Sequence, residues 1–210
     1  MKPQTSHDLF VLAPVVPVVV LDDADTAVPL ARALVRGGLP AIEVTLRTEA
    51  GLAAIERIAA EVPDAVVGAG TVTTPEQAAA AAKAGSAFLV SPGCTDRLRG
   101  AMADTGVPFL PGVATASEAM ALLEQGVDAL KFFPAEAAGG RAYLKSLSGP
   151  LPQVRFCPTG GVTPASAPEY LALPNVGCVG GTWLTPRDAV EAGDWDRIES
   201  LAREAAALRP

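Results

Sequence analysis

The chain has 210 residues, of which 50% are apolar and 19% are charged, and its formal net charge is −7. This length suits one domain with a sizeable core, and the apolar content gives no signature of disorder. An acidic chain without a block of basic residues lacks the surface that binds nucleic acid, so any positive field for an anionic ligand must be built locally.

An apolar run from Leu9 to Leu21 opens the chain. It is too short to span a bilayer and contains Pro14 and Pro17, so it predicts a buried first strand rather than a membrane anchor or a signal peptide. We expect at most a short N-terminal helix or extension before that strand. The three cysteines fit small buried side chains in a reducing compartment. The expected location is the cytoplasm, without membrane association.

Short apolar runs alternate with alanine-rich segments of helical period along almost the whole chain. The runs cover residues 14–21, 41–46, 65–72, 87–92, 108–113, 129–134, 154–160 and 176–184. The helical segments include residues 26–37, 49–61, 75–85, 116–126, 164–173 and about 194–208. Asp25 or Thr26 is expected to cap the first helix, Pro75 to open the third, and Gly85 and Gly126 to end two of them.

Eight strand–helix units follow one another at a pitch of about 19 to 25 residues, with no linker between them. The strands are continuously apolar, as expected of a parallel sheet covered on both faces. The pattern predicts an α/β fold, a single (β/α)8 TIM barrel domain over residues 1–210. A doubly wound open sheet is the alternative, but no Gly-x-Gly-x-x-Gly follows the first strand.

Lys131 interrupts an apolar strand, ALKFFP at 129–134, whereas the other three lysines have bland surroundings. A buried ammonium is costly unless it is paired. A desolvated amine is a nucleophile that attacks carbonyl groups. We interpret Lys131 as a candidate nucleophile, with a structural ion pair as the alternative.

Glu43 lies in the second predicted strand, within AIEVTL at 41–46. Side chains alternate along a strand, so Glu43, Thr45 and Arg47 share one face. Strands two and six contribute to common interior layers of a barrel, which lets Glu43 face Lys131. The carboxylate would then serve as a general acid/base and as a counter-charge. A buried ion pair kept for structure is the alternative.

Other strand ends offer groups that suit an anionic substrate. Arg47 carries a fork of donors for a carboxylate, and Thr71 adds a hydroxyl after VVGAG, where Gly68 and Gly70 allow a close approach of ligand or backbone. Glycine pairs also follow the seventh strand, at 160–161, and the eighth, at 180–181. Free backbone N–H groups at these two positions indicate a phosphate site.

His7 is the only histidine and lies near the N-terminus. Catalysis by Ser-His or Cys-His and metal binding by His/Cys ligands are therefore not expected. We predict no metal and no cofactor.

Together these stretches resemble the family of 2-keto-3-deoxy-6-phosphogluconate (KDPG) and 4-hydroxy-2-oxoglutarate (KHG) aldolases. The matching stretches run in order over roughly residues 14–185, and IEVTLRT and LKFFPAE are the specific ones. The resemblance implies a class I aldolase without a cofactor, which forms homotrimers and releases pyruvate from a small phosphorylated keto acid. The implied roles are Lys131 as Schiff-base lysine, Glu43 as general acid/base, Arg47 and Thr71 for the pyruvyl group, Pro92 and Phe133 as pocket lining, and Gly160, Gly161, Gly181 and Thr182 for the phosphate. Thr182 stands where family members often carry serine, and threonine keeps the hydroxyl.

Several functions remain open on the sequence alone. An unphosphorylated KHG substrate, or the galactonate epimer of KDPG, would need the same lysine and glutamate. A phosphate-binding barrel isomerase or synthase would use Lys131 only to neutralise charge. A sugar-phosphate binding protein would show affinity without turnover.

Overall fold

Parallel strands make up the centre of the structure, a computed structural model that describes residues 3–208. They form a six-stranded sheet in the order β5-β4-β3-β2-β1-β9 and a three-stranded sheet in the order β6-β7-β8. Their bounds are β1 Val15–Val19, β2 Ala41–Thr45, β3 Val66–Gly70, β4 Leu89–Val90, β5 Phe109–Leu110, β6 Gly112–Val113, β7 Ala129–Phe132, β8 Arg155–Pro158 and β9 Val179–Gly181. Each predicted apolar run therefore contains a strand.

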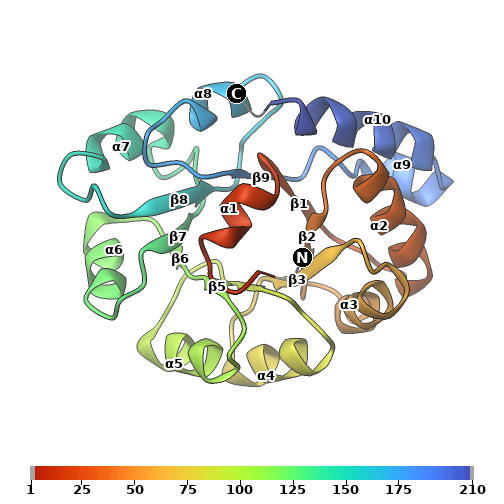
Figure 1. The fold of residues 1–210 in the computed structure, drawn as a ribbon, viewed down its shortest axis with the longest axis horizontal. Coiled ribbons are helices and arrows are strands. Elements are labelled where there is room, and N and C mark those ends of the chain that lie inside the picture. The colour runs from red at the N-terminus through yellow and green to blue at the C-terminus, as the bar shows by residue number, and fades with distance from the viewer. Residues whose placement is uncertain (1–2, 209–210) are drawn as a thin grey trace.

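Helices surround the strands (Figure 1). Their bounds are α1 Asp8–Leu12, the 3-10 helix η1 Ala24–Thr26, α2 Ala27–Arg36, α3 Ala50–Glu61, α4 Pro75–Lys83, α5 Asp96–Asp104, α6 Ala116–Leu123, α7 Gly140–Leu147, α8 Ala167–Leu171, α9 Arg187–Ala192 and α10 Trp195–Ala206. The six helical segments singled out in the sequence are confirmed as α2, α3, α4, α6, α8 and α10. Within residues 3–208 no helix is long and apolar enough to cross a membrane.

The two sheets are joined by one chain segment and by two bridges. Pro111 lies between β5, which pairs with β4, and β6, which pairs with β7, and its missing N–H interrupts the ladder. Isolated parallel bridges join Phe156 to Val176 and Thr159 to Gly180. The result is a mixed α/β fold with parallel strands in a curled sheet. Of the predicted closed eight-stranded barrel, only this coarser fold is confirmed, because the strands do not form one continuous hydrogen-bonded sheet.

Both faces of the strands are buried, as their continuous apolar runs predict. On β1, Val15 and Val19 belong to the large cluster that packs against the helices. Val16 points the other way and belongs to a second cluster inside the curled sheet, with Ala41 of β2 and Val66 of β3. Alternation along each strand thus divides the core into an outer layer and an inner one.

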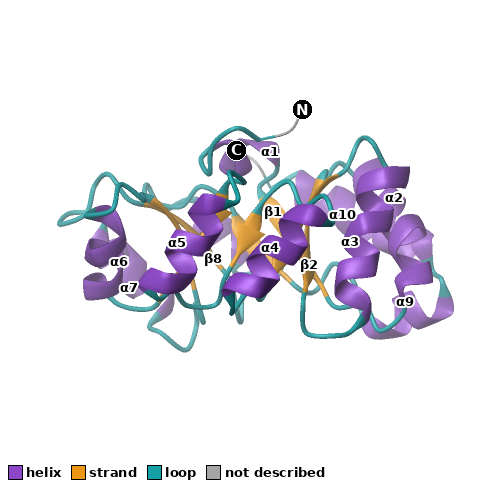
Figure 2. Ribbon diagram, turned by 90° about the horizontal axis from the view of Figure 1, so that it is seen from below, coloured by secondary structure: helices purple, strands orange, loops and turns teal. Residues whose placement is uncertain are grey.

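The apolar run at 9–21 forms two elements, so its interpretation as a single strand is wrong at its start. Leu9 and Phe10 lie on the predicted short N-terminal helix, α1, and pack into the inner cluster, with 1% and 7% exposure. The Ser6 hydroxyl donates to the Phe109 carbonyl at 2.8 Å, at the start of β5. Helix α1 therefore covers the amino ends of the strands (Figure 2).

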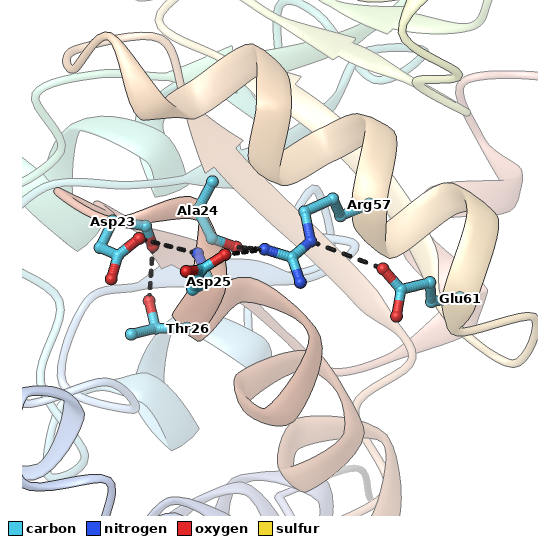
Figure 3. A network of polar contacts seen from close by, with 6 residues as sticks. All are labelled: Asp23, Ala24, Asp25, Thr26, Arg57 and Glu61. Carbon is cyan, nitrogen blue, oxygen red and sulfur yellow. Dashed lines mark hydrogen bonds and ion pairs between the residues drawn. The ribbon is translucent and has the colours of Figure 1, made fainter.

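A polar network fixes the turn after β1 (Figure 3). The Asp23 carboxylate accepts from the Asp25 N–H at 2.9 Å, and the Thr26 hydroxyl donates to the Asp23 carbonyl at 2.7 Å. Arg57 of α3 donates to the Ala24 carbonyl at 3.2 Å and contacts the Asp25 carboxylate. Thr26 occupies the predicted N-cap position of α2, but its side chain makes no capping bond there; the side chain that caps this turn is that of Asp23, at the start of the preceding 3-10 helix.

Candidate functional site

A buried ion pair lies inside the curled sheet. Lys131 of β7 donates to Glu43 of β2, with 3.1 Å between Nζ and Oε1. Each residue is 3% exposed. Because β2 and β7 belong to different sheets, the pair connects one wall with the other. The structure thus brings together the two side chains that the predicted barrel layers placed face to face.

This geometry suits covalent chemistry at an amine. The Glu43 carboxylate lies within hydrogen-bond reach of the amine, so it can take a proton from it and return the proton later. Lys131 Nζ also lies 5.4 Å from the centroid of the Phe133 ring, within the range of a cation–π contact. An ammonium so placed is compensated by the carboxylate and the ring.

Two glycines of β3 make room for side chains rather than for ligand or backbone, which corrects the sequence-based interpretation. A Cβ on Gly70 would lie 2.2 Å from Glu43 Oε1, and a Cβ on Gly68 would lie 2.5 Å from the Phe88 ring. Both distances are far below van der Waals contact. Gly70 therefore gives the Glu43 carboxylate the space that it occupies beside Lys131.

Arg47 and Thr71 meet at the carboxyl ends of β2 and β3. The Arg47 Nε donates to the Thr71 hydroxyl at 3.1 Å, and Arg47 is exposed. Thr71 has φ of +58°, a left-handed conformation that a β-branched residue rarely adopts. Thr45, on the same face of β2, is buried and donates to the Val19 carbonyl at 3.1 Å. Strain at Thr71 marks a position held by its surroundings.

Pro92 contacts the register partner of Lys131, and Phe133 lies near its amine. Gly112 is the register partner of Lys131, and a Cβ on Gly112 would lie 2.3 Å from the Pro92 carbonyl group. A Cβ on Gly160 would lie 3.2 Å from the Phe133 ring. The Phe133 ring is thus near both the amine and the first glycine pair.

The glycine pair after β8 has an unusual backbone. Gly160 and Gly161 have φ of +99° and +82°, values that favour glycine. Within residues 3–208 the N–H groups of Gly160, Gly161 and Thr182 donate to no protein acceptor. Exposed donors of this kind form an anion-binding concavity.

A cavity of about 530 Å³ opens beside Thr182. Thr182 is the predicted site residue on its wall. Val18, which also lines it, is the register partner of Glu43, so the cavity reaches the strand next to the ion pair. The lining residues are Val18, Val20, Asp22, Asp23, Thr26, Thr182, Thr185, Arg187, Val190 and Glu191.

Two buried side chains, one beside Lys131 and one next to it in turn, were not predicted from the sequence as parts of the site. Cys157 is the register partner of Lys131, and Thr159, two residues on, places its hydroxyl 3.8 Å from the Cys157 sulfur. A hydrogen bond with Cys178 and the nearby Lys131 charge lower the pKa of the Cys157 thiol, against the opposing effect of burial. The alternation of VRFCPTG could have placed both side chains on the inner face.

Comparison with known proteins gives concordant matches. The family model for KDPG and KHG aldolases matches residues 7–201. A 2-dehydro-3-deoxy-phosphogluconate aldolase of Pseudoalteromonas atlantica is 53% identical over 97% of this chain and 94% of its own. A KHG/KDPG aldolase of Escherichia coli is 52% identical over 96% and 94%. The crystal structure of a Legionella pneumophila KDPG aldolase, with pyruvate captured at low pH as a covalent carbinolamine intermediate, has a TM-score of 0.94 and 45% identity, covering 98% and 100%.

Proposed function

The chain belongs to the KDPG and KHG aldolase family, and we propose that it cleaves KDPG to pyruvate and glyceraldehyde 3-phosphate through a Schiff base on Lys131. The observation that carries this assignment is the buried contact of 3.1 Å between Lys131 and Glu43. The carbinolamine captured in the Legionella pneumophila relative supports the same class of chemistry. Residues 1–210 would form one (β/α)8 domain, which the bridges between β8 and the β9 segment support.

Schiff-base formation is the first step. Neutral Lys131 attacks the C2 carbonyl of the substrate, and loss of water from the carbinolamine gives an iminium. Glu43 accepts the proton that the ammonium releases, and supplies the proton that turns the C2 hydroxyl into leaving water. The contact between the two side chains places both transfers within reach.

Bond cleavage follows from the iminium. Glu43 accepts the C4 hydroxyl proton through a bridging water while the C3–C4 bond breaks, and the electron pair moves to the iminium nitrogen. Glyceraldehyde 3-phosphate leaves with the new carbonyl at C4. The remaining enamine is protonated at C3, and hydrolysis of the iminium releases pyruvate and Lys131.

The ends of the substrate would be held by different groups. Arg47 and Thr71, 3.1 Å apart, suit the carboxylate of the pyruvyl moiety, with Pro92 and Phe133 as the walls beside the amine. The phosphate would accept hydrogen bonds from the N–H groups of Gly160, Gly161 and Thr182 and from the Thr182 hydroxyl. Gly181, which pairs with β1 at the end of β9, would line the phosphate site through its lack of a side chain.

Borohydride trapping tests the assignment. Pyruvate and borohydride together should add a stable mass to the peptide that contains Lys131, and the reduced enzyme should be inactive. An adduct on Lys145 instead, or none, would end the Schiff-base assignment. Activity that is lost on chelation and restored by zinc or magnesium would favour a metal-dependent route.

KHG is the second candidate substrate, because the Escherichia coli relative is named for both activities. A panel of KDPG, its galactonate epimer and KHG separates the possibilities by kcat/KM. KDPG should be preferred if the glycine pairs bind phosphate. A preference for KHG would assign the unphosphorylated substrate.

We further propose that the protein acts in the cytoplasm as a homotrimer. The support is the family assignment, together with three cysteines that form no disulfide in residues 3–208. Light scattering coupled to size exclusion should give the mass of three chains. A monomer mass at working concentration would exclude the trimer.

A further inference from the structure

The turn that follows Phe133 is anchored to the glycine pair at two successive peptide groups. The Ala135 N–H donates to the Thr159 carbonyl at 2.8 Å, and the Glu136 N–H donates to the Gly160 carbonyl at 3.0 Å. These two carbonyls belong to the same peptide groups as the N–H of Gly160 and the N–H of Gly161. The turn therefore binds the carbonyls of the two peptide groups whose N–H groups, those of Gly160 and Gly161, would bind a phosphate.

Because a peptide group is planar, a contact that holds its carbonyl also fixes the direction of its N–H. In a trans peptide group the carbonyl and the N–H point to opposite sides. Carbonyls held by the turn at 135–136 fix the N–H groups of Gly160 and Gly161 on the far side. A carbonyl that accepts a hydrogen bond also polarises the N–H of its own group, which strengthens it as a donor. Glycine at φ of +99° and +82° cannot supply this stiffness itself, because its backbone is the freest of all.

The Glu136 side chain completes the anchor. A Cβ on Gly161 would lie 2.7 Å from Glu136 Cγ, so the Glu136 side chain packs directly on Gly161. Its carboxylate accepts from the Tyr170 hydroxyl of α8 at 2.7 Å. Tyr170 has 0% exposure. The Gly140 N–H closes the same turn on the Ala135 carbonyl at 2.9 Å.

We propose that Glu136 is a positioning residue for the phosphate-bearing end of the substrate, acting through Gly160 and Gly161 while held by Tyr170. The inference rests on the proposed function, since it requires that these N–H groups bind the phosphate. Glu136 takes no part in proton transfer at Lys131. Its effect is therefore confined to binding of phosphorylated ligands.

Kinetics on two substrates test this role. Glu136→Ala and Tyr170→Phe each remove one hydrogen-bonded contact, so KM for KDPG should rise roughly five-fold, with kcat within about two-fold. The KM for KHG, which has no phosphate, should stay unchanged. Glu136→Gln keeps an acceptor for Tyr170 and should retain the KM of the parent enzyme. Glu169→Ala is the matched control, since Glu169 pairs with Arg141 on the surface beside the anchor and should alter neither substrate.

Inorganic phosphate gives a second readout. It should inhibit KDPG cleavage competitively, with a Ki that rises in Glu136→Ala as much as KM does, while trapping of pyruvate by borohydride proceeds at the parent rate. Equal changes for KDPG and KHG, an unchanged KM in Glu136→Ala, or a loss in Glu136→Gln as large as in Glu136→Ala would overturn the inference. A parent enzyme that phosphate does not inhibit and that treats both substrates alike would overturn the phosphate site itself.

Discussion

Lys131→Met removes the amine and leaves the Glu43 carboxylate buried without its partner. Breaking one side of a buried pair costs about 3 to 5 kcal/mol of stability, because the remaining charge is uncompensated. Both residues are only 3% exposed, so solvent cannot screen the loss. In a chain of this length, about 2 to 4 °C of Tm accompany each kcal/mol. The variant should melt about 6 to 20 °C below the parent.

A double variant separates the energetic argument from the chemical one. Lys131→Met combined with Glu43→Leu replaces the pair by two apolar side chains of similar size, which is often neutral or stabilising. It should recover the Tm of the parent, whereas turnover should stay absent in both variants. Thermal unfolding and a coupled pyruvate assay measure the two quantities. If Lys131→Met unfolds at the parent temperature, the two side chains do not form a buried ion pair. If Lys131→Met turns over at the parent rate, Lys131 is not the nucleophile.

Three further experiments probe the site and the rest of the chain. Thr71→Gly relieves a left-handed backbone at φ of +58° and should stabilise the chain by about 1 kcal/mol, while kcat/KM falls because the hydroxyl is lost. A lower unfolding free energy would contradict the strain. Burial raises the pKa of the Cys94 thiol to about 11, so iodoacetamide at about pH 8 should alkylate it roughly 100-fold more slowly than an ordinary thiol. The rate should climb with pH until about pH 11, and a plateau near pH 9 would exclude the shift. Gly70→Ala places a Cβ 2.2 Å from Glu43 Oε1 and should abolish most turnover. Gly93→Ala, with open space around it, should behave like the parent.

The periodic part of the fold could be predicted because its signals are local. Alternation of apolar runs and alanine-rich segments located every strand region, and Pro75 begins α4 as predicted, with Thr74 as its cap. The division of the run at 9–21 could not be predicted. Leu9 and Phe10 are apolar because they are buried, as strand residues would also be. Only their position in the inner cluster, at the amino ends of the strands, distinguishes a helix from a longer strand.

The site could be predicted at the positions where a charged residue interrupts an apolar strand. A lysine inside ALKF and a glutamate inside AIEVT are unusual for core strands, and the layer rule for even-numbered barrel strands was needed to place them face to face. The anchor on the glycine pair gave no such signal. Glu136 reads as an ordinary polar residue after a strand, and its contact with Gly161 arises only when the turn after β7 folds against the turn after β8.

Glycines, which have no side chain, shape the interior as much as the bulky residues do. Neighbouring strands lie about 4.8 Å apart, so bulky inward groups at one height would collide unless a neighbour has no Cβ. Several such groups lie where a glycine leaves the space free. The side-chain pairs are Gly68 with Phe88, Gly70 with Glu43 and Gly180 with Thr159, and Gly112 leaves room in the same way for the backbone carbonyl of Pro92. Glycine at 70 lets the carboxylate lie along the wall and still reach Lys131 across the interior. The contact between Lys131 and Glu43 is therefore encoded jointly by the two charged residues and by Gly70, and a chain with the same charges but alanine at 70 would lack it.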